Sequence, residues 1–104
     1  MNADPVATPL RARLVVASPG PVETALDVQP IPAEHALTVG RLCLVDDAAT
    51  RIRDVRVAVG EDGVVRIHVL VPAEQAPGRY AALVLDDTTN VPVGELTVVV
   101  PAVA

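Results

Sequence analysis

The chain of 104 residues contains no phenylalanine, tryptophan or lysine, and only one cysteine, one serine and one tyrosine. A single cysteine, Cys43, excludes an intrachain disulfide. No apolar run reaches the roughly 18 residues that a membrane-spanning helix needs. The first residues also lack the apolar core of a secretory signal. We therefore expect a cytoplasmic protein, or an extracellular one if the sequence is trimmed from a longer chain.

The scarcity of reactive and aromatic side chains also limits the possible functions. Ser18 is the only serine and the six glycines are dispersed, so neither a serine-based triad nor a phosphate-binding loop is indicated. The net charge of −5 disfavours binding to nucleic acid, because phosphates repel an acidic surface. Exposed aromatic rings for stacking sugars are missing, which argues against a carbohydrate partner. We predict a protein that is not an enzyme and uses no cofactor, metal or membrane.

What the chain does contain is valine, alanine, leucine and ten prolines, with 51% of its residues hydrophobic. Valine favours strands because its branched Cβ fits a pleated sheet, and proline and glycine favour the turns between short elements. The composition predicts a single all-β domain. All eight basic residues are arginine, which is typical of GC-rich bacterial genomes.

The hydrophobic alternation predicts seven short antiparallel strands in two sheets, after a flexible N-terminal arm at residues 1–9. Residues 10–104 form the domain. An irregularity is expected near Asp54, and "GEDG" at 60–63 predicts a hairpin loop. The predicted strands are residues 10–17, 22–28, 37–45, 51–59, 64–71, 79–86 and 93–100.

The only aromatic residue, Tyr80, follows Pro77-Gly78 at the start of a predicted strand. This P-G-x-Y arrangement resembles the tyrosine corner of immunoglobulin-like and fibronectin type III-like domains. The resemblance implies a seven-stranded antiparallel sandwich, and it implies structural roles for Tyr80 and Gly78, with the hydroxyl bonded to the backbone of the preceding connector. Without a Cys–Trp–Cys pattern, the relatives it implies are disulfide-free bacterial modules.

Candidate chemical groups are few. Cys43 lies within a predicted strand, where a buried structural thiol is expected, although His35 is the one base that could approach it. His68 alternates with Ile67 and Val69 and is expected to point outward. Acidic pairs occur at 46–47, 61–62 and 86–87, which leaves a calcium site in the loops as an alternative to solvated turns.

The last strands depart from strict alternation of apolar and polar residues. If Tyr80, Ala82 and Val84 face the core, apolar residues remain on the outer side of their strand. The resemblance implies that the predicted strands 37–45, 79–86 and 93–100 are strands C, F and G of one sheet, whose outer face would then be apolar. Such patches mark interfaces in soluble domains. In residues 37–45, whichever parity is buried, the other carries either Leu42 and Leu44 or Cys43 and Val45. The predicted interface residues are Leu42, Leu44, Leu83, Leu85 and Val99, with Arg41 and Arg79 at the rim.

These observations predict a non-catalytic protein–protein interaction module, either a homodimer or an accessory subunit of a larger assembly. Two alternatives remain open at the level of the sequence. One is an extracellular adhesion or spacer module, and the other is a sandwich that binds calcium or another ligand through its acidic loops.

Overall fold

The computed structural model describes residues 9–102, which form nine β-strands and no helix. The described part of the chain therefore has no helix that could cross a membrane. The strands are β1 (Ala12–Ala17), β2 (Glu23–Val28), β3 (Leu37–Val39), β4 (Leu42–Leu44), β5 (Asp47–Ile52), β6 (Asp54–Val59), β7 (Val65–Leu70), β8 (Gly78–Asp86) and β9 (Val91–Val100). The prediction of an all-β chain is confirmed.

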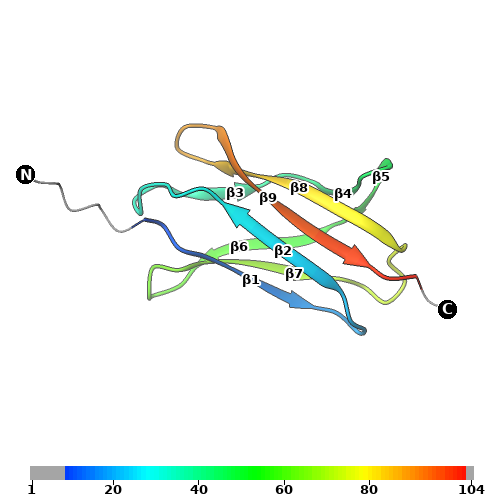
Figure 1. Ribbon diagram of the computed structural model, residues 1–104. Helices are drawn as coiled ribbons and strands as arrows, with labels where there is room; N and C mark the ends of the chain where they lie inside the picture. Colours follow the sequence, from blue (N-terminus) through cyan, green and yellow to red (C-terminus); the bar gives the residue numbers. More distant parts are fainter. Residues whose placement is uncertain (1–8, 103–104) are drawn as a thin grey trace, which may run out of the picture.

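The strands form two sheets that pack against each other (Figure 1). The small sheet has the order β1-β7-β6, and the large sheet has the order β2-β9-β8-β4-β5, with β3 also paired to β8. The predicted two-sheet sandwich is confirmed in this sense. The predicted grouping of residues 37–45, 79–86 and 93–100 in one sheet is also correct, because β3, β4 and β9 all pair with β8.

The prediction of seven antiparallel strands is wrong in several details. Residues 47–50, expected as a loop, begin β5, and the chain changes sheets at Arg53 between β5 and β6. This change of sheet is the irregularity expected near Asp54. β1 runs parallel to β7, and β2 pairs with β9 rather than with a strand of the small sheet.

A bulge splits the predicted strand 37–45 into β3 and β4. Val39 lies opposite Val84 and Leu44 lies opposite Tyr80, so five residue steps on one strand match four on the other. An extra residue reverses which side chains face inward. Odd-numbered residues before the bulge and even-numbered residues after it therefore face the core, and Leu42 is only 1% exposed.

The core lies between the sheets, where apolar side chains from both layers meet. β7 alternates strictly, and Val65, Ile67, Val69 and Val71 are all buried, as expected from the outward position predicted for His68. β8 contributes Tyr80, Ala82 and Val84, as predicted. The other buried core residues are Ile31, Leu37, Leu42, Ile52, Val93, Leu96 and Val98.

Tyr80 is fully buried, and its hydroxyl forms two hydrogen bonds with the connector between β7 and β8. The hydroxyl donates a hydrogen bond to the Ala76 carbonyl (2.6 Å) and accepts one from Nε2 of Gln75 (2.8 Å). This is the connector contact that the sequence motif predicted. Gly78 has a φ of 138°, and a Cβ there would lie 2.6 Å from Cδ2 of Leu44, so both the backbone conformation and the close packing favour glycine.

The predicted hairpin at 60–63 joins β6 to β7. Gly60 N–H donates to the Val64 carbonyl (3.0 Å), and Gly63 has a φ of 78°. Most of the predicted N-terminal arm lies outside the described residues. Its last residue, Pro9, forms an isolated bridge with Pro32.

Candidate protein-binding surface

The outer face of the large sheet, the surface turned away from the small sheet, is built from three rows of side chains that cross the strands. The middle row contains Ala25, Thr97, Ala81, Cys43 and Arg51. One flanking row contains Asp27, Glu95 and Leu83. The second flanking row contains Glu23, Val99, Arg79 and Val45. Val45 belongs to this row because its N–H donates a hydrogen bond to the Arg79 carbonyl.

The centre of the outer face is apolar. Leu83 is 54% exposed and Val45 is 61% exposed, while Ala81, Val99 and Cys43 are partly exposed between them. The middle row consists of the smaller residues Ala25, Thr97, Ala81 and Cys43, with Arg51 at its end. Two exposed apolar side chains, Leu83 and Val45, therefore lie on either side of this row.

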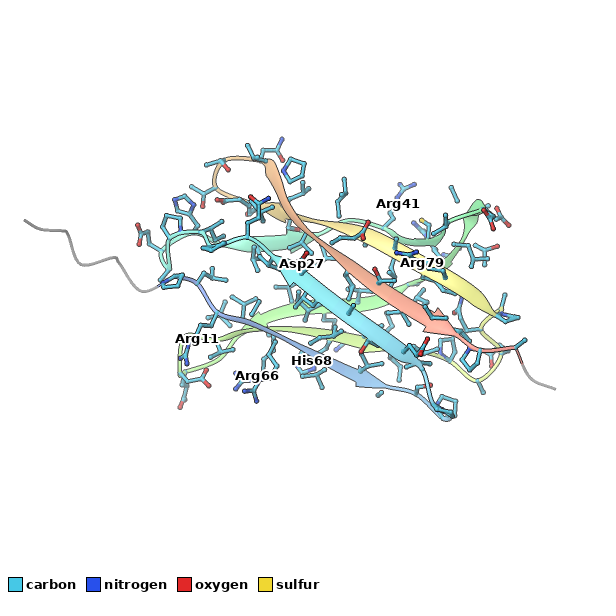
Figure 2. The ribbon with its side chains drawn as sticks, in the orientation of Figure 1. Arg11, Asp27, Arg41, Arg66, His68 and Arg79 are labelled. Atoms are coloured by element: carbon cyan, nitrogen blue, oxygen red, sulfur yellow. The ribbon has the colours of Figure 1, made fainter. Side chains whose placement is uncertain are left out.

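Charges on the outer face separate by sign. Glu23 and Asp27 on β2 and Glu95 on β9 are exposed and acidic, whereas the opposite side carries Arg79, Arg51 and Arg41. Figure 2 shows Asp27 on one side of β9, and Arg41 and Arg79 on the other. Asp27 lies directly opposite Glu95, a pairing of like charges that destabilises a sheet unless a cation approaches.

The structure brings together some of the predicted interface residues and separates others. Leu83, Leu85, Val99 and Arg79 lie on the outer face, and Arg41 is exposed in the bulge beside it. The prediction that Leu42 and Leu44 lie on this face is wrong, because the bulge turns both toward the core. Cys43 and Val45 take their place. The alternation of residues 37–45 allowed either set, and no local signal distinguished them.

A second site joins the connector before β3 to the turn after β8. Nδ1 of His35 donates a hydrogen bond to Oδ2 of the buried Asp86 (2.7 Å), which also accepts from the N–H groups of Thr88 and Thr89. Burial alone would raise the pKa of Asp86, but the hydrogen bonds from His35 and from the two N–H groups, with the charge of His35, lower it. His35 is therefore bonded to a carboxylate at the end of the predicted strand 79–86, in one of the acidic pairs considered for calcium.

The other acidic pairs are also engaged in local bonds. Asp47 accepts from the Ala49 N–H and the Thr50 hydroxyl. Asp62 accepts from Arg66, and this bond lowers the pKa of Asp62 and raises that of Arg66. Among residues 9–102, no three His, Cys, Asp or Glu side chains lie close enough together to hold a metal ion.

The outer face of the small sheet has a different character. His68 is exposed there, as predicted, near Arg66 and Arg11 (Figure 2). Exposed Leu70 lies on the same face, with 48% of its surface accessible. Because this face is mainly basic, it lacks the paired acidic and basic halves of the large sheet.

Comparison of the chain with known protein families, with curated proteins and with solved structures finds no match.

Proposed function

We propose that this protein is a non-catalytic interaction module that associates with a second copy of itself through the outer face of the large sheet. The observation that carries the proposal is the division of this face into an acidic and a basic half around the exposed Leu83. A surface with this division is complementary to itself, as a two-fold interface requires.

Charge complementarity selects the direction of the two-fold axis. An axis along β8, lying between two facing sheets, places the β2 side of one copy over the β5 side of the other. Asp27 then approaches Arg51 of the second copy, and Glu95 approaches Arg41. The same axis sets Leu83 and Arg79 each against its own equivalent, and Val45 against Val99 of the second copy. An axis across the strands would instead set acidic residues against acidic residues.

The size of the face predicts the strength of this association. Five strands lie about 4.8 Å apart, and the three rows of outward side chains span about six residues along them, so the face covers roughly 24 Å by 20 Å. That area lies below the ~800 Å² that each partner buries in a standard interface. We therefore expect a dissociation constant in the micromolar rather than the nanomolar range.

The test is light scattering coupled to size exclusion over a wide range of loading concentrations. Wild type is expected to shift from monomer to dimer, whereas Leu83→Asp should remain a folded monomer. Leu70→Asp is the matched control, because it places the same charge at a similarly exposed leucine on the small sheet. A wild-type monomer at every concentration, or equal effects of the two variants, would contradict the proposal.

The proposed geometry has its own test. Glu95→Arg and Arg41→Glu should each weaken the dimer, and the two changes together in one chain should restore it. A double variant that is weaker than either single variant would reject the axis along β8. Such a result would reject the axis but not self-association, which the Leu83→Asp variant tests separately.

We further propose that the fold is a divergent member of the immunoglobulin-like class. The hydrogen bond from the Tyr80 hydroxyl to the Ala76 carbonyl supports this assignment, as does the joining of β4, β8 and β9 in one sheet. The pairing of β2 with β9 is a departure from that class.

A further inference from the structure

The free edge of the small sheet presents unpaired backbone groups on β6. Gly60 N–H bonds the Val64 carbonyl, and hydrogen-bonded pairs alternate with non-bonded pairs along an antiparallel ladder. The Val57–Ile67 and Val59–Val65 pairs are therefore of the non-bonded type. In these two pairs, Val57 and Val59 of β6 therefore point both their N–H and their C=O groups away from β7.

β7 shows the same alternation, because Val65 N–H donates to the Arg11 carbonyl and so points toward β1 rather than toward β6. Val55 N–H is used locally, in a bond to the Arg53 carbonyl. Among residues 9–102, no strand pairs with the outer edge of β6. Four backbone groups, two on Val57 and two on Val59, are thus directed toward solvent.

The same two residues expose apolar side chains that face the interior of the sandwich. Val57 is 37% exposed and Val59 is 67% exposed, although their partners Ile67 and Val65 are buried. Side chains that point inward and yet meet solvent indicate that the small sheet ends one strand short of covering its inner face. An added strand would cover both valines and bond their backbone.

Arginines surround this edge. A groove of about 470 Å³ extends from Val55 at the start of β6 to residues 39–42, and its lining includes Arg41, Arg51 and Arg53. None of these three forms an ion pair with a described residue. Arg56 is exposed on the outer side of β6 and forms an ion pair with Asp54 of the same strand (3.5 Å). The three groove arginines make the charge beside the start of β6 positive, although the chain as a whole is acidic.

We propose that the open edge of β6 binds an extended segment of a partner protein, which adds to the small sheet as a fourth strand. Alternate residues of this segment are apolar and cover Val57 and Val59. The intervening residues are acidic and lie beside Arg56 and the groove arginines, as cross-strand pairing of opposite charges favours. The edge of β6 does not include Leu83 at the centre of the outer face of the large sheet, although Arg41 and Arg51 border both surfaces. The proposal does not depend on self-association.

The test uses a phage-displayed library of random linear ten-residue segments, selected on the wild-type protein. We expect enriched segments to alternate apolar residues with Asp or Glu. A synthetic peptide of the most enriched sequence should slow hydrogen exchange at the amides of Val57 and Val59. Leu83→Asp should leave the affinity for this peptide unchanged.

Two variants decide where the peptide binds. Val57→Pro removes one outward N–H and leaves the ladder with β7 in place, so the peptide should bind about tenfold or more weakly. Arg56→Glu should weaken binding without any change to the backbone. Arg13→Glu, an equal charge change at an exposed position on β1, is the control.

Failure to enrich any segment, enrichment without the alternation, or equal affinity of the peptide for wild type and Val57→Pro would overturn the proposal. If Val57→Pro does not fold, equal affinities for Arg56→Glu and Arg13→Glu would overturn it. Peptide-induced protection that excludes Val57 and Val59 would do the same.

Discussion

Removal of the Tyr80 hydroxyl is the sharpest test of how the connector before β8 is held. The hydroxyl is the only hydrogen-bond donor found for the Ala76 carbonyl among the described residues, and it accepts from Gln75 Nε2. Tyr80→Phe keeps the buried ring and leaves the Ala76 carbonyl without this donor. An unsatisfied group of this kind costs about 1–3 kcal/mol, so we expect the free energy of unfolding to fall by about 2 kcal/mol.

The assay is urea unfolding followed by far-ultraviolet circular dichroism, because the variant has no other aromatic residue for fluorescence. For a small domain, a loss of about 2 kcal/mol lowers the urea midpoint by roughly 1–2 M at an unchanged m-value. Gln75→Leu removes the second partner, and the double variant should lose less than the sum of the two single losses. A midpoint within experimental error of wild type for Tyr80→Phe would refute this account of the corner.

Three further predictions concern the core, the sheet and the response to pH. In urea unfolding, Leu42→Ala should lower the free energy of unfolding by about 2–5 kcal/mol, whereas Leu83→Ala should change it by no more than about 0.5 kcal/mol. Equal losses would contradict the bulge that turns Leu42 into the core and leaves Leu83 on the surface. Gly94→Ala should lower the free energy of unfolding by about 1–3 kcal/mol, because the new Cβ would meet the Asp27 carbonyl oxygen and lie 2.8 Å from Val28 Cα. Gly20→Ala is the control and should leave stability unchanged, because a Cβ at Gly20 has no atom within 4 Å. Folding lowers the pKa of Asp86, so the stability that ionised Asp86 contributes is present above its unfolded pKa, near 4, and is lost as the pH falls through the lower folded pKa. Asp86→Asn should therefore make the melting temperature fall less steeply as the pH is lowered. An unchanged dependence of melting temperature on pH in acid would argue against the His35–Asp86 bond.

Local patterns predicted the features that depend on neighbouring residues alone. Strict alternation identified the buried side of β7 and β8, because successive side chains on a strand point to opposite faces. The Pro-Gly before Tyr80 predicted its contact with the connector, and the glycines at 60 and 63 predicted the hairpin. The exposure of Leu83 followed from the same alternation.

The features that depend on distant pairing could not be read from those patterns. In residues 37–45 both parities are apolar, so the inward set was fixed only when β8 imposed a bulge between Val39 and Leu44. The same bulge moved Leu42 into the core and Val45 onto the surface. Nothing in the sequence links His35 to Asp86, which are 51 residues apart.

The sequence by itself determined an all-β chain and the inward faces of β7 and β8, because alternation and turn chemistry act over a few residues. Tertiary structure alone decided that β2 pairs with β9, that the chain changes sheets at Arg53, and that β6 is left as an open edge. It also decided that acidic side chains of β2 and β9 share one face with arginines of β5 and β8. The reason is physical: the free energy that selects strand partners comes from burying side chains that are distant in sequence, and many pairings satisfy the same local alternation.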